Sequence, residues 1–225
     1  MNLVGVIIQA RMGSTRLPGK VLKDVGHKPL LKHITDKLKK QGKYPFIVAT
    51  STLPDDYKIA AFCESEYVSC FRGNEQDVLD RYYQCAKSQS FQNIVRLTAD
   101  NPFVDVDEMD KMIQSFLIKK PDYMDNFSTL PIGAGCEVFT FKSLEESHRR
   151  GTEAHHREHV NEYIQENPQL YKRIIFDAPI SKKFPEVRLT IDTPLDLNRA
   201  NFICQKIGTE NISTEDAIQM AQVFG

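Results

Sequence analysis

Residues 5–22 read GVIIQARMGSTRLPGKVL, an apolar run that leads directly into a basic loop with two glycines. The continuous apolar run over Val4–Ile8 is typical of a strand buried on both faces of a parallel sheet. A parallel sheet binds its ligand beyond the carboxyl ends of its strands, so this loop is expected at the binding edge. Its glycines let backbone N–H groups approach an anion, and its cations, Arg11, Arg16 and Lys20, suit a polyphosphate.

Two common phosphate-binding motifs do not account for this loop. A Walker A motif reads G-x-x-x-x-G-K-[ST], whereas five residues separate Gly13 from Gly19 here. Val21 follows Lys20, where that motif has the hydroxyl that binds Mg²⁺. The dinucleotide fingerprint G-x-G-x-x-G is also absent from the loop. The loop therefore predicts neither a P-loop kinase nor a Rossmann dehydrogenase.

Apolar strand-like runs alternate with amphipathic segments, most regularly over about the first 120 residues. This alternation predicts an α/β fold with a Rossmann-like, doubly wound and mostly parallel sheet. We expect residues 1–225 to form a single domain, in which residues 125–185 are an insertion against its face. The predicted strands are 4–8, 46–50, 67–71, 93–97, 136–141, 171–176 and 187–191, and the predicted helices are 29–40, 55–63, 77–87, 107–119, 157–166, 194–207 and 214–224.

The composition limits the class of protein. A net charge of −1 gives no general attraction for nucleic acid. No apolar run approaches the roughly 18 residues that cross a bilayer, and the N-terminal apolar stretch is expected to be a strand rather than a signal peptide. Five cysteines without a CxxC pair favour reduced thiols. We therefore predict a cytoplasmic protein that binds neither nucleic acid nor membrane.

The basic loop resembles the N-terminal signature of nucleotidyltransferases that activate sugars. It is most similar to the cytidylyltransferase branch, and within it to the SpsF-like family of spore coat polysaccharide biosynthesis, which is related to synthetases of CMP-activated sugar acids. Three more blocks resemble the family in the same order, although Ala99 stands where many members have glycine. They are FRGNEQDVLDRY at 71–82, RLTADNP at 96–102 and RLTIDTP at 188–194. The resemblance implies a fold of the nucleotide-diphospho-sugar transferase type.

The resemblance also implies a reaction. CMP would pass from CTP to a sugar acid or related sugar, with release of pyrophosphate, in the synthesis of a surface polysaccharide or glycoconjugate. Lys20, Arg11 and Arg16 are the candidate catalytic residues, because cations stabilise the charge that builds on phosphate oxygens. Asp100 and Asp192 match the positions that hold the metal in the resembling family, and Mg²⁺, which prefers such carboxylates, is the one cofactor expected. A turn cap and a helix N-cap are the structural alternatives for these two residues.

The substrates are expected on two sides of this edge. The acceptor sugar is expected against the insertion, near Glu137, Arg157 and His159, where a cation would meet the carboxylate of a sugar acid. For Arg72, a surface ion pair is an equally good interpretation. The residues expected to bind the nucleotide are Gln9, Ala10, Gly13, Ser14, Thr50, Ser51, Arg72, Gly73 and Thr98.

Three other interpretations of the sequence compete with these predictions. The first is a glycosyltransferase of GT-A-like fold that uses a nucleotide-sugar; 105–107 reads D-V-D, the spelling of its metal motif, but these residues look like a helix start. The second is a non-catalytic assembly subunit, which the retained Lys20, Asp100 and Asp192 disfavour. The third is a zinc site at 155–159, which lacks the HExxH arrangement, so a polar helix start is the preferred interpretation. The residues leave open the acceptor, the choice of CTP over UTP and the oligomeric state; relatives in the branch are often dimers, so a homodimer is one expectation.

Overall fold

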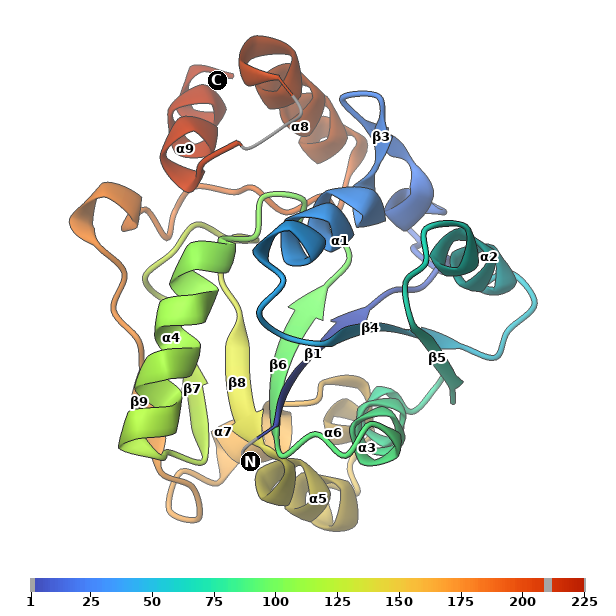
Figure 1. Cartoon of the computed structure of the whole chain (residues 1–225), viewed down its shortest axis with the longest axis vertical. Coiled ribbons are helices and arrows are strands. Elements are labelled where there is room, and N and C mark those ends of the chain that lie inside the picture. Colours follow the sequence, from blue (N-terminus) through green and yellow to red (C-terminus); the bar gives the residue numbers. More distant parts are fainter. Residues whose placement is uncertain (1–2, 209–211, 225) are drawn as a thin grey trace.

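A seven-stranded sheet forms the centre of the molecule, and helices cover both of its faces (Figure 1). The computed structural model describes residues 3–208 and 212–224. The strand order is β5-β4-β1-β6-β8-β7-β9; β8 runs antiparallel to both of its neighbours, and the other pairs are parallel. The strands are β1 (Val4–Gln9), β4 (Phe46–Ser51), β5 (Cys70–Gly73), β6 (Asn93–Thr98), β7 (Tyr123–Asp125), β8 (Glu137–Thr140) and β9 (Arg173–Ile175). The doubly wound, mostly parallel sheet predicted from the sequence is confirmed.

Side chains at the helix starts explain why several helices begin where they do. Asp77, Asp105, Thr140, Thr193 and Ser213 each accept a hydrogen bond from a backbone N–H three residues later. Such caps satisfy donors that the first turn leaves open. The helices are α1 (Leu30–Gln41), α2 (Tyr57–Ser65), α3 (Val78–Ser88), α4 (Val106–Lys119), α5 (Phe141–Arg150), α6 (Ala154–Glu158), α7 (Glu162–Glu166), α8 (Pro194–Ile207) and α9 (Thr214–Val223). Short 3-10 turns lie at η1 (Lys20–Leu22) and η2 (Ile180–Lys182), and a small hairpin pairs β2 (Asp24–Val25) with β3 (Lys28–Pro29).

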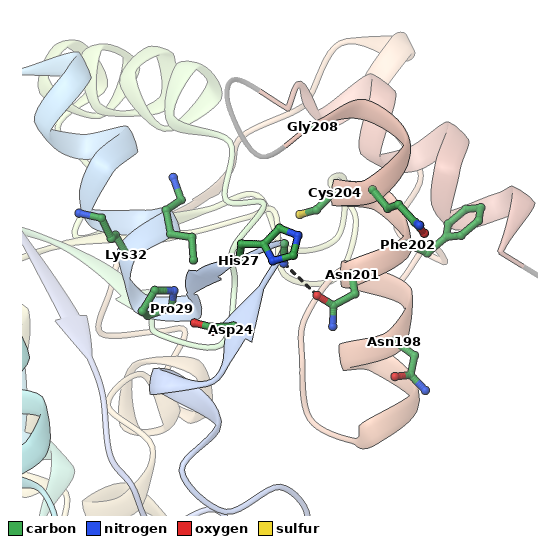
Figure 2. A pocket seen from close by; sticks show the side chains of 12 residues that line it. Asp24, His27, Pro29, Lys32, Asn198, Asn201, Phe202, Cys204 and Gly208 are labelled. Carbon is green, nitrogen blue, oxygen red and sulfur yellow. Dashed lines mark hydrogen bonds between the residues drawn. The ribbon is translucent and has the colours of Figure 1, made fainter.

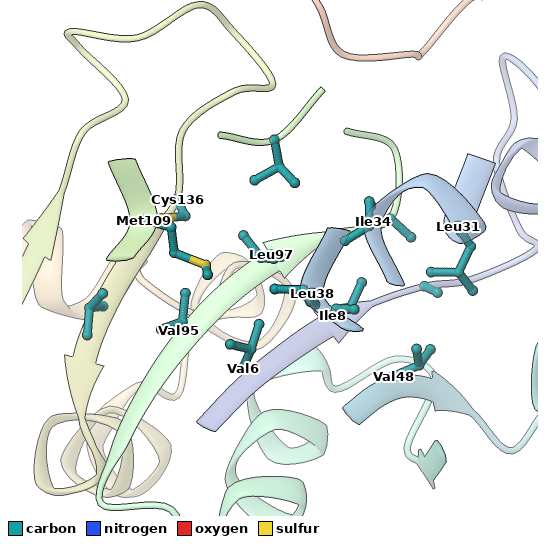
Figure 3. Packing of buried hydrophobic residues seen from close by; sticks show 14 of the residues in the cluster. Val6, Ile8, Leu31, Ile34, Leu38, Val48, Val95, Leu97, Met109 and Cys136 are labelled. Atoms are coloured by element: carbon teal, nitrogen blue, oxygen red, sulfur yellow. The ribbon is translucent and has the colours of Figure 1, made fainter. Parts of the chain in front are cut away.

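Strand β1 is apolar throughout because both of its faces are covered. Val6 and Ile8 pack into the core below α1 and α4, whereas Ile7 packs into the core on the side of α3. Figure 3 shows the first of these cores, in which side chains of β1, β4 and β6 meet those of α1. The two clusters fix the sheet between two helical layers, so the carboxyl ends of β1, β4, β5 and β6 emerge at one edge. No helix in the described ranges is long and apolar enough to span a bilayer.

Two sequence-based predictions of secondary structure were wrong. The helix predicted at 157–166 is two short helices, α6 and α7, separated by an extended backbone at His159. The strand predicted at 187–191 is instead a loop with one isolated bridge between Ile132 and Arg188. Its backbone bonds to Ile132 and Asp100 hold it across the sheet edge rather than within a ladder.

The segment 125–185, expected as an insertion, contributes β8 and β9 to the main sheet and pairs antiparallel with β6. Helix α5, strand β7 and the β2–β3 hairpin were not predicted, because each is short or strongly polar. A third core packs α8 and α9 against the β2–β3 hairpin.

Gly133 holds the loop that precedes Asp192 and should not tolerate a side chain. Its φ is +96°, and an added Cβ would lie 2.5 Å from the backbone nitrogen of Thr190. We expect Gly133→Ala to lower the free energy of unfolding by about 2–4 kcal/mol, measured by urea denaturation. Gly42→Ala is the matched control, because Gly42 has a left-handed φ of +62° and an added Cβ would meet only the carbonyl oxygen of Lys39, at 3.7 Å. It should cost only about 1 kcal/mol, and equal losses would contradict the clash.

Candidate active site

The side chain of Lys20 joins three segments that lie far apart in the sequence. Its Nζ donates to Asp100 Oδ2, Asp192 Oδ1 and the carbonyl oxygen of Ile191, each at 2.8 Å. Gly19, at φ +69°, provides the left-handed turn that starts η1 and directs Lys20 toward the sheet edge. Asp100 follows β6 and Asp192 precedes α8, so the two carboxylates converge on one point beyond the strand ends.

Asp56 fixes the start of the basic loop. Its Oδ1 accepts from the backbone N–H of Met12 at 2.6 Å, and its Oδ2 accepts from the hydroxyl of Ser51 at 2.5 Å. The loop closes on itself where the N–H of Gly19 donates to the carbonyl of Met12 at 3.0 Å. Through these hydrogen bonds, the buried carboxylate of Asp56 connects the basic loop to the end of β4.

A pocket of about 450 Å³ opens over this edge. It brings together ten of the residues predicted from the sequence, and it adds Thr15, Val78, Arg96 and Glu158. Three cations of the loop and the carboxylates of Asp100 and Asp192 share its wall, so it can receive an anionic ligand and a divalent cation together. The ten predicted residues are Gln9, Arg11, Gly13, Ser14, Arg16, Lys20, Thr98, Asp100, His159 and Asp192.

Five residues predicted to bind the nucleotide do not line this pocket. Ala10 is buried, and its N–H donates to the carbonyl of Ala49. Thr50 and Ser51 are buried in β4, where Ser51 serves Asp56. Arg72 donates to the carbonyls of Ser51 and Leu53 and lies over the ring of Tyr57. Gly73 pairs with Ser51 in the sheet. Ala10 directly follows β1, whereas the other four residues belong to β4 and β5.

Two residues predicted to bind the acceptor are likewise turned away from the pocket wall. Glu137 is fully buried, and its two oxygens accept from Arg96 and Tyr123. Arg157 forms an ion pair with Asp77 and donates to the carbonyls of His148 and Gly151. In both cases the charged group that was predicted to bind a ligand is paired with another residue of the protein.

The carboxylate of Asp192 is held ionised by its neighbours. Burial alone would raise its pKa, but hydrogen bonds from Lys20 and Arg188 and the charges of Lys20 and Arg16 lower it below the ordinary value. Arg16 Nη2 lies 3.3 Å from Asp192 Oδ1, and its side chain is 63% exposed. A carboxylate surrounded by three cations stays charged at neutral pH, which a metal ligand requires.

Asp196 organises the turn that carries Asp192. Its Oδ2 accepts from the N–H groups of Asp192 and Thr193 at 3.1 and 3.0 Å, and its Oδ1 accepts from Arg188 and Arg199. With Thr193 it forms the capping box of α8. Sequence reasoning missed Asp196, although the spacing T-P-L-D at 193–196 was a usable signal for it.

The histidine cluster is a network of hydrogen bonds. Among the described residues, His155, His156 and Glu166 have ligand atoms within 4.8 Å of one another. The Nε2 atoms of the two histidines lie 2.8 and 2.7 Å from the oxygens of Glu166. Because the N–H of Glu153 donates to His156 Nδ1, the proton of this imidazole belongs on Nε2, where a metal would need a lone pair. The structure thus favours the polar interpretation of this segment, and His159 lies apart on the pocket wall.

A larger pocket, of about 1060 Å³, lies elsewhere, between the β2–β3 hairpin and α8 (Figure 2). None of the residues predicted for the site lines it. The N–H of Gly26 donates to Asn201 across it, and the lysines on its wall pair with acidic side chains outside it, Lys28 with Asp36 and Lys32 with Glu66. Its size alone therefore does not make it the catalytic site.

Comparison with known proteins agrees with the geometry. The family model described as cytidylyltransferase matches residues 5–214. The chain belongs to the cytidylyltransferase family. It is 36% identical to the spore coat polysaccharide biosynthesis protein SpsF of Bacillus subtilis, over 98% of this chain and 94% of that protein.

Solved structures give the same family and fold. A cytidylyltransferase from Leptospira borgpetersenii is similar with a TM-score of 0.87 and 31% identity, covering 98% of this chain and 92% of that one. A CMP:2-keto-3-deoxy-manno-octonic acid synthetase, in a complex with CTP, shares the fold with a TM-score of 0.64 and 16% identity, covering 91% and 100%. The cytidylyltransferase described here therefore has the fold of nucleotide-sugar transferases.

Asp196 should make the stability of this cytidylyltransferase depend on acidic pH. Burial would raise its pKa, but hydrogen bonds from Thr193 and the backbone, with the charge of Arg188, lower it to about 2. A lowered pKa means that the ionised group stabilises the fold fully above its ordinary value of 3.8 and loses this effect as the pH falls toward 2. We therefore expect the free energy of unfolding, measured by urea denaturation, to fall more for the wild type than for Asp196→Asn when the pH is lowered from about 5 to about 2.5.

The matched control is Asp216→Asn, since Asp216 occupies the same position after the Ser213 N-cap of α9 but is exposed. At neutral pH, Asp196→Asn should cost about 1–3 kcal/mol and the control less. Parallel pH profiles for the wild type and Asp196→Asn would contradict the role of this carboxylate.

Proposed function

We propose that this cytidylyltransferase transfers CMP from CTP to a sugar acid or related sugar and releases pyrophosphate. The observation that carries the proposal is the convergence of Lys20, Asp100 and Asp192 in one pocket with Arg11 and Arg16. This arrangement supplies cations for a triphosphate and carboxylates for a metal at the same edge of the sheet. The names of the relatives support cytosine as the base.

The proposed chemistry relies on electrostatic stabilisation. A hydroxyl of the acceptor attacks the α-phosphorus of CTP and gives its proton to solvent. The bond from the α-phosphorus to the bridging oxygen breaks, and pyrophosphate leaves with the bonding electrons. Negative charge grows on the phosphate oxygens, where Arg11, Arg16 and Lys20 would stabilise it. The exposed side chain of Arg16 is free to turn toward a bound triphosphate.

The two carboxylates fit a magnesium ion. Oxygens of Asp100 and Asp192 both lie 2.8 Å from the Lys20 ammonium, so a single cation at that point reaches both. Mg²⁺ would be held there by these two residues and by substrate phosphates, and it would polarise the phosphoryl group under attack. The ammonium group of Lys20 occupies this position in the free protein, so it would move toward the substrate phosphates if the metal bound here.

The D-V-D sequence at 105–107 does not form the metal site that a glycosyltransferase would need. Asp105 is buried at the start of α4, where it caps the N–H of Glu108 and accepts from Thr214 at 2.6 Å. Lys182 Nζ lies 2.8 Å from the same carboxylate. The D-V-D sequence therefore anchors α9 and η2 to α4, away from the candidate active site.

The cellular setting is also part of the proposal. All five cysteines are free thiols, which fits a reducing compartment such as the cytoplasm. The relative SpsF is named for spore coat polysaccharide biosynthesis. We therefore propose that this protein acts in the synthesis of a surface polysaccharide or glycoconjugate.

Nucleotide binding tests the proposal directly. With Mg²⁺ present, CTP should raise the melting temperature more than UTP, ATP, GTP or dTTP, because a ligand that binds only the native state stabilises it by mass action. UDP- and GDP-sugars are the controls for a glycosyltransferase. Stabilisation by a nucleotide-sugar without any response to a triphosphate would overturn the proposed function. Selective stabilisation by CTP would be followed by a screen of sugar acids for pyrophosphate release.

The position of Lys20 predicts competition with the metal. In Lys20→Met, Asp100 and Asp192 lose their shared cation, so Mn²⁺ should bind the nucleotide-free protein at least about tenfold more tightly than it binds the wild type. Electron paramagnetic resonance of free Mn²⁺ measures this without any turnover. Lys23→Met, at an exposed lysine of the same segment, is the control and should leave Mn²⁺ affinity unchanged. Equal Mn²⁺ affinities in all three proteins would contradict a metal site at this position.

A further inference from the structure

Arg96 lies where two pockets meet. It lines the candidate active site and also a neighbouring pocket of about 330 Å³, here called the acceptor-side pocket, on the side of the 127–135 loop. Thr98 and Asp100 are the other residues that the two pockets share. Sequence reasoning gave Arg96 no role, although it begins the block RLTADNP. A group bound in the acceptor-side pocket would therefore reach the reaction centre past this side chain.

A buried carboxylate holds one end of the Arg96 guanidinium. Arg96 of β6 is in register with Glu137 of β8, and its Nη1 donates to Glu137 Oε1 at 2.5 Å. The other oxygen of Glu137 accepts from the hydroxyl of Tyr123 at 2.5 Å. Glu137 has no exposed surface, so it cannot serve a ligand itself. It fixes which way the guanidinium faces.

The opposite edge of the same guanidinium has no partner. Arg96 Nε is buried and finds no acceptor among the described residues, and no hydrogen bond within that part of the chain uses Nη2. The N–H groups of Nε and Nη2 point in parallel, a fork that matches the two oxygens of a carboxylate or phosphate. Buried donors are almost always satisfied in folded proteins, so the buried and unpaired Nε beside a pocket indicates a ligand acceptor.

The rest of the acceptor-side pocket suits a hydroxylated molecule. Asn101 Oδ1 is buried and has no donor within residues 3–208 and 212–224, while its Nδ2 donates to Thr98 at 2.8 Å. Phe127 and Ile132 line the pocket and are each 44% exposed. An unpaired acceptor can take a hydroxyl proton, and the apolar rim can cover the C–H face of a sugar ring.

We propose that Arg96 is a specificity-determining residue that binds an anionic group of the acceptor through its Nε–Nη2 edge, and that Glu137 and Tyr123 are positioning residues for it. The inference rests on the proposed function, because it assigns the acceptor to the pocket beside the CTP site. The anionic group is a carboxylate or a phosphate. Arg11, Arg16 and Lys20 remain available for the triphosphate on the other side of the site.

The experiment measures binding of three probes by titration calorimetry: glucuronate, glucose 1-phosphate and glucose. The wild type should bind one of the anionic probes at least tenfold more tightly than glucose, and the preferred probe distinguishes a carboxylate from a phosphate. Arg96→Gln should abolish this preference, and Arg96→Lys, which keeps the charge without the fork, should retain only part of it. Arg149→Gln, at a side chain that is 70% exposed, is the control and should bind like the wild type.

The positioning role has its own readout. Glu137→Gln and Tyr123→Phe should weaken the anionic probe severalfold and leave CTP affinity unchanged, and retained CTP binding also shows that each variant is folded. In ¹⁵N-arginine spectra of the wild type, the Nε–H signal that Arg96→Lys removes should shift when the anionic probe is added. An unmoved signal would overturn direct contact.

The outcomes separate this inference from the proposed function. A wild type that fails to bind CTP contradicts the proposed function. Normal CTP binding, together with no preference for either anionic probe over glucose, overturns the role of Arg96 alone. The same holds if Arg96→Gln and Arg96→Lys both keep the preference of the wild type.

Discussion

The contact of the Lys20 ammonium with Asp100, Asp192 and the carbonyl of Ile191 is the interaction on which the active edge depends. It joins a loop after β1, the end of β6 and the turn before α8. Without the cation, two carboxylates would face the same point and repel each other, so this position requires a positive charge. The same geometry that stabilises the free protein thus creates a position for a metal ion.

The carboxylates near this edge divide into two that bind the protein backbone and two that face the pocket. Asp56 binds the backbone of the basic loop, and Asp196 binds the backbone of the turn that carries Asp192. Both are buried at helix starts, where the protein supplies their hydrogen bonds and no ligand competes for them. Asp100 and Asp192 are left to face the pocket. Separating supporting carboxylates from reactive ones keeps the site rigid while two acidic groups remain accessible.

The pair of Arg96 and Glu137 follows a similar rule at the centre of the sheet. A buried charge is tolerated only when it is paired, and Glu137 is paired with Arg96 and Tyr123 on one face of β6, β8 and β7. The sequence analysis selected Glu137 as a ligand for the acceptor because it stands in a block, GAGCEVFTF, that resembles the family. Strand register decided otherwise, since only the antiparallel pairing of β8 with β6 places Arg96 beside it.

Asp192 was selected through the resemblance of RLTIDTP at 188–194 to a family block, because the strand predicted before it is a loop. The sequence by itself determined the mostly parallel sheet, and it placed the basic loop with Lys20, as well as Asp100, at the ends of its strands. These follow from local signals: continuous apolar runs mark strands covered on both faces, and the ends of parallel strands share one edge. Only the tertiary structure decided that Arg72 and Glu137 turn to internal partners, that 187–191 is a loop, and that Arg96 lies between two pockets. The reason is physical. A hydrogen-bonded partner from a distant strand determines which way a charged side chain points, and no spacing along the chain records that partner.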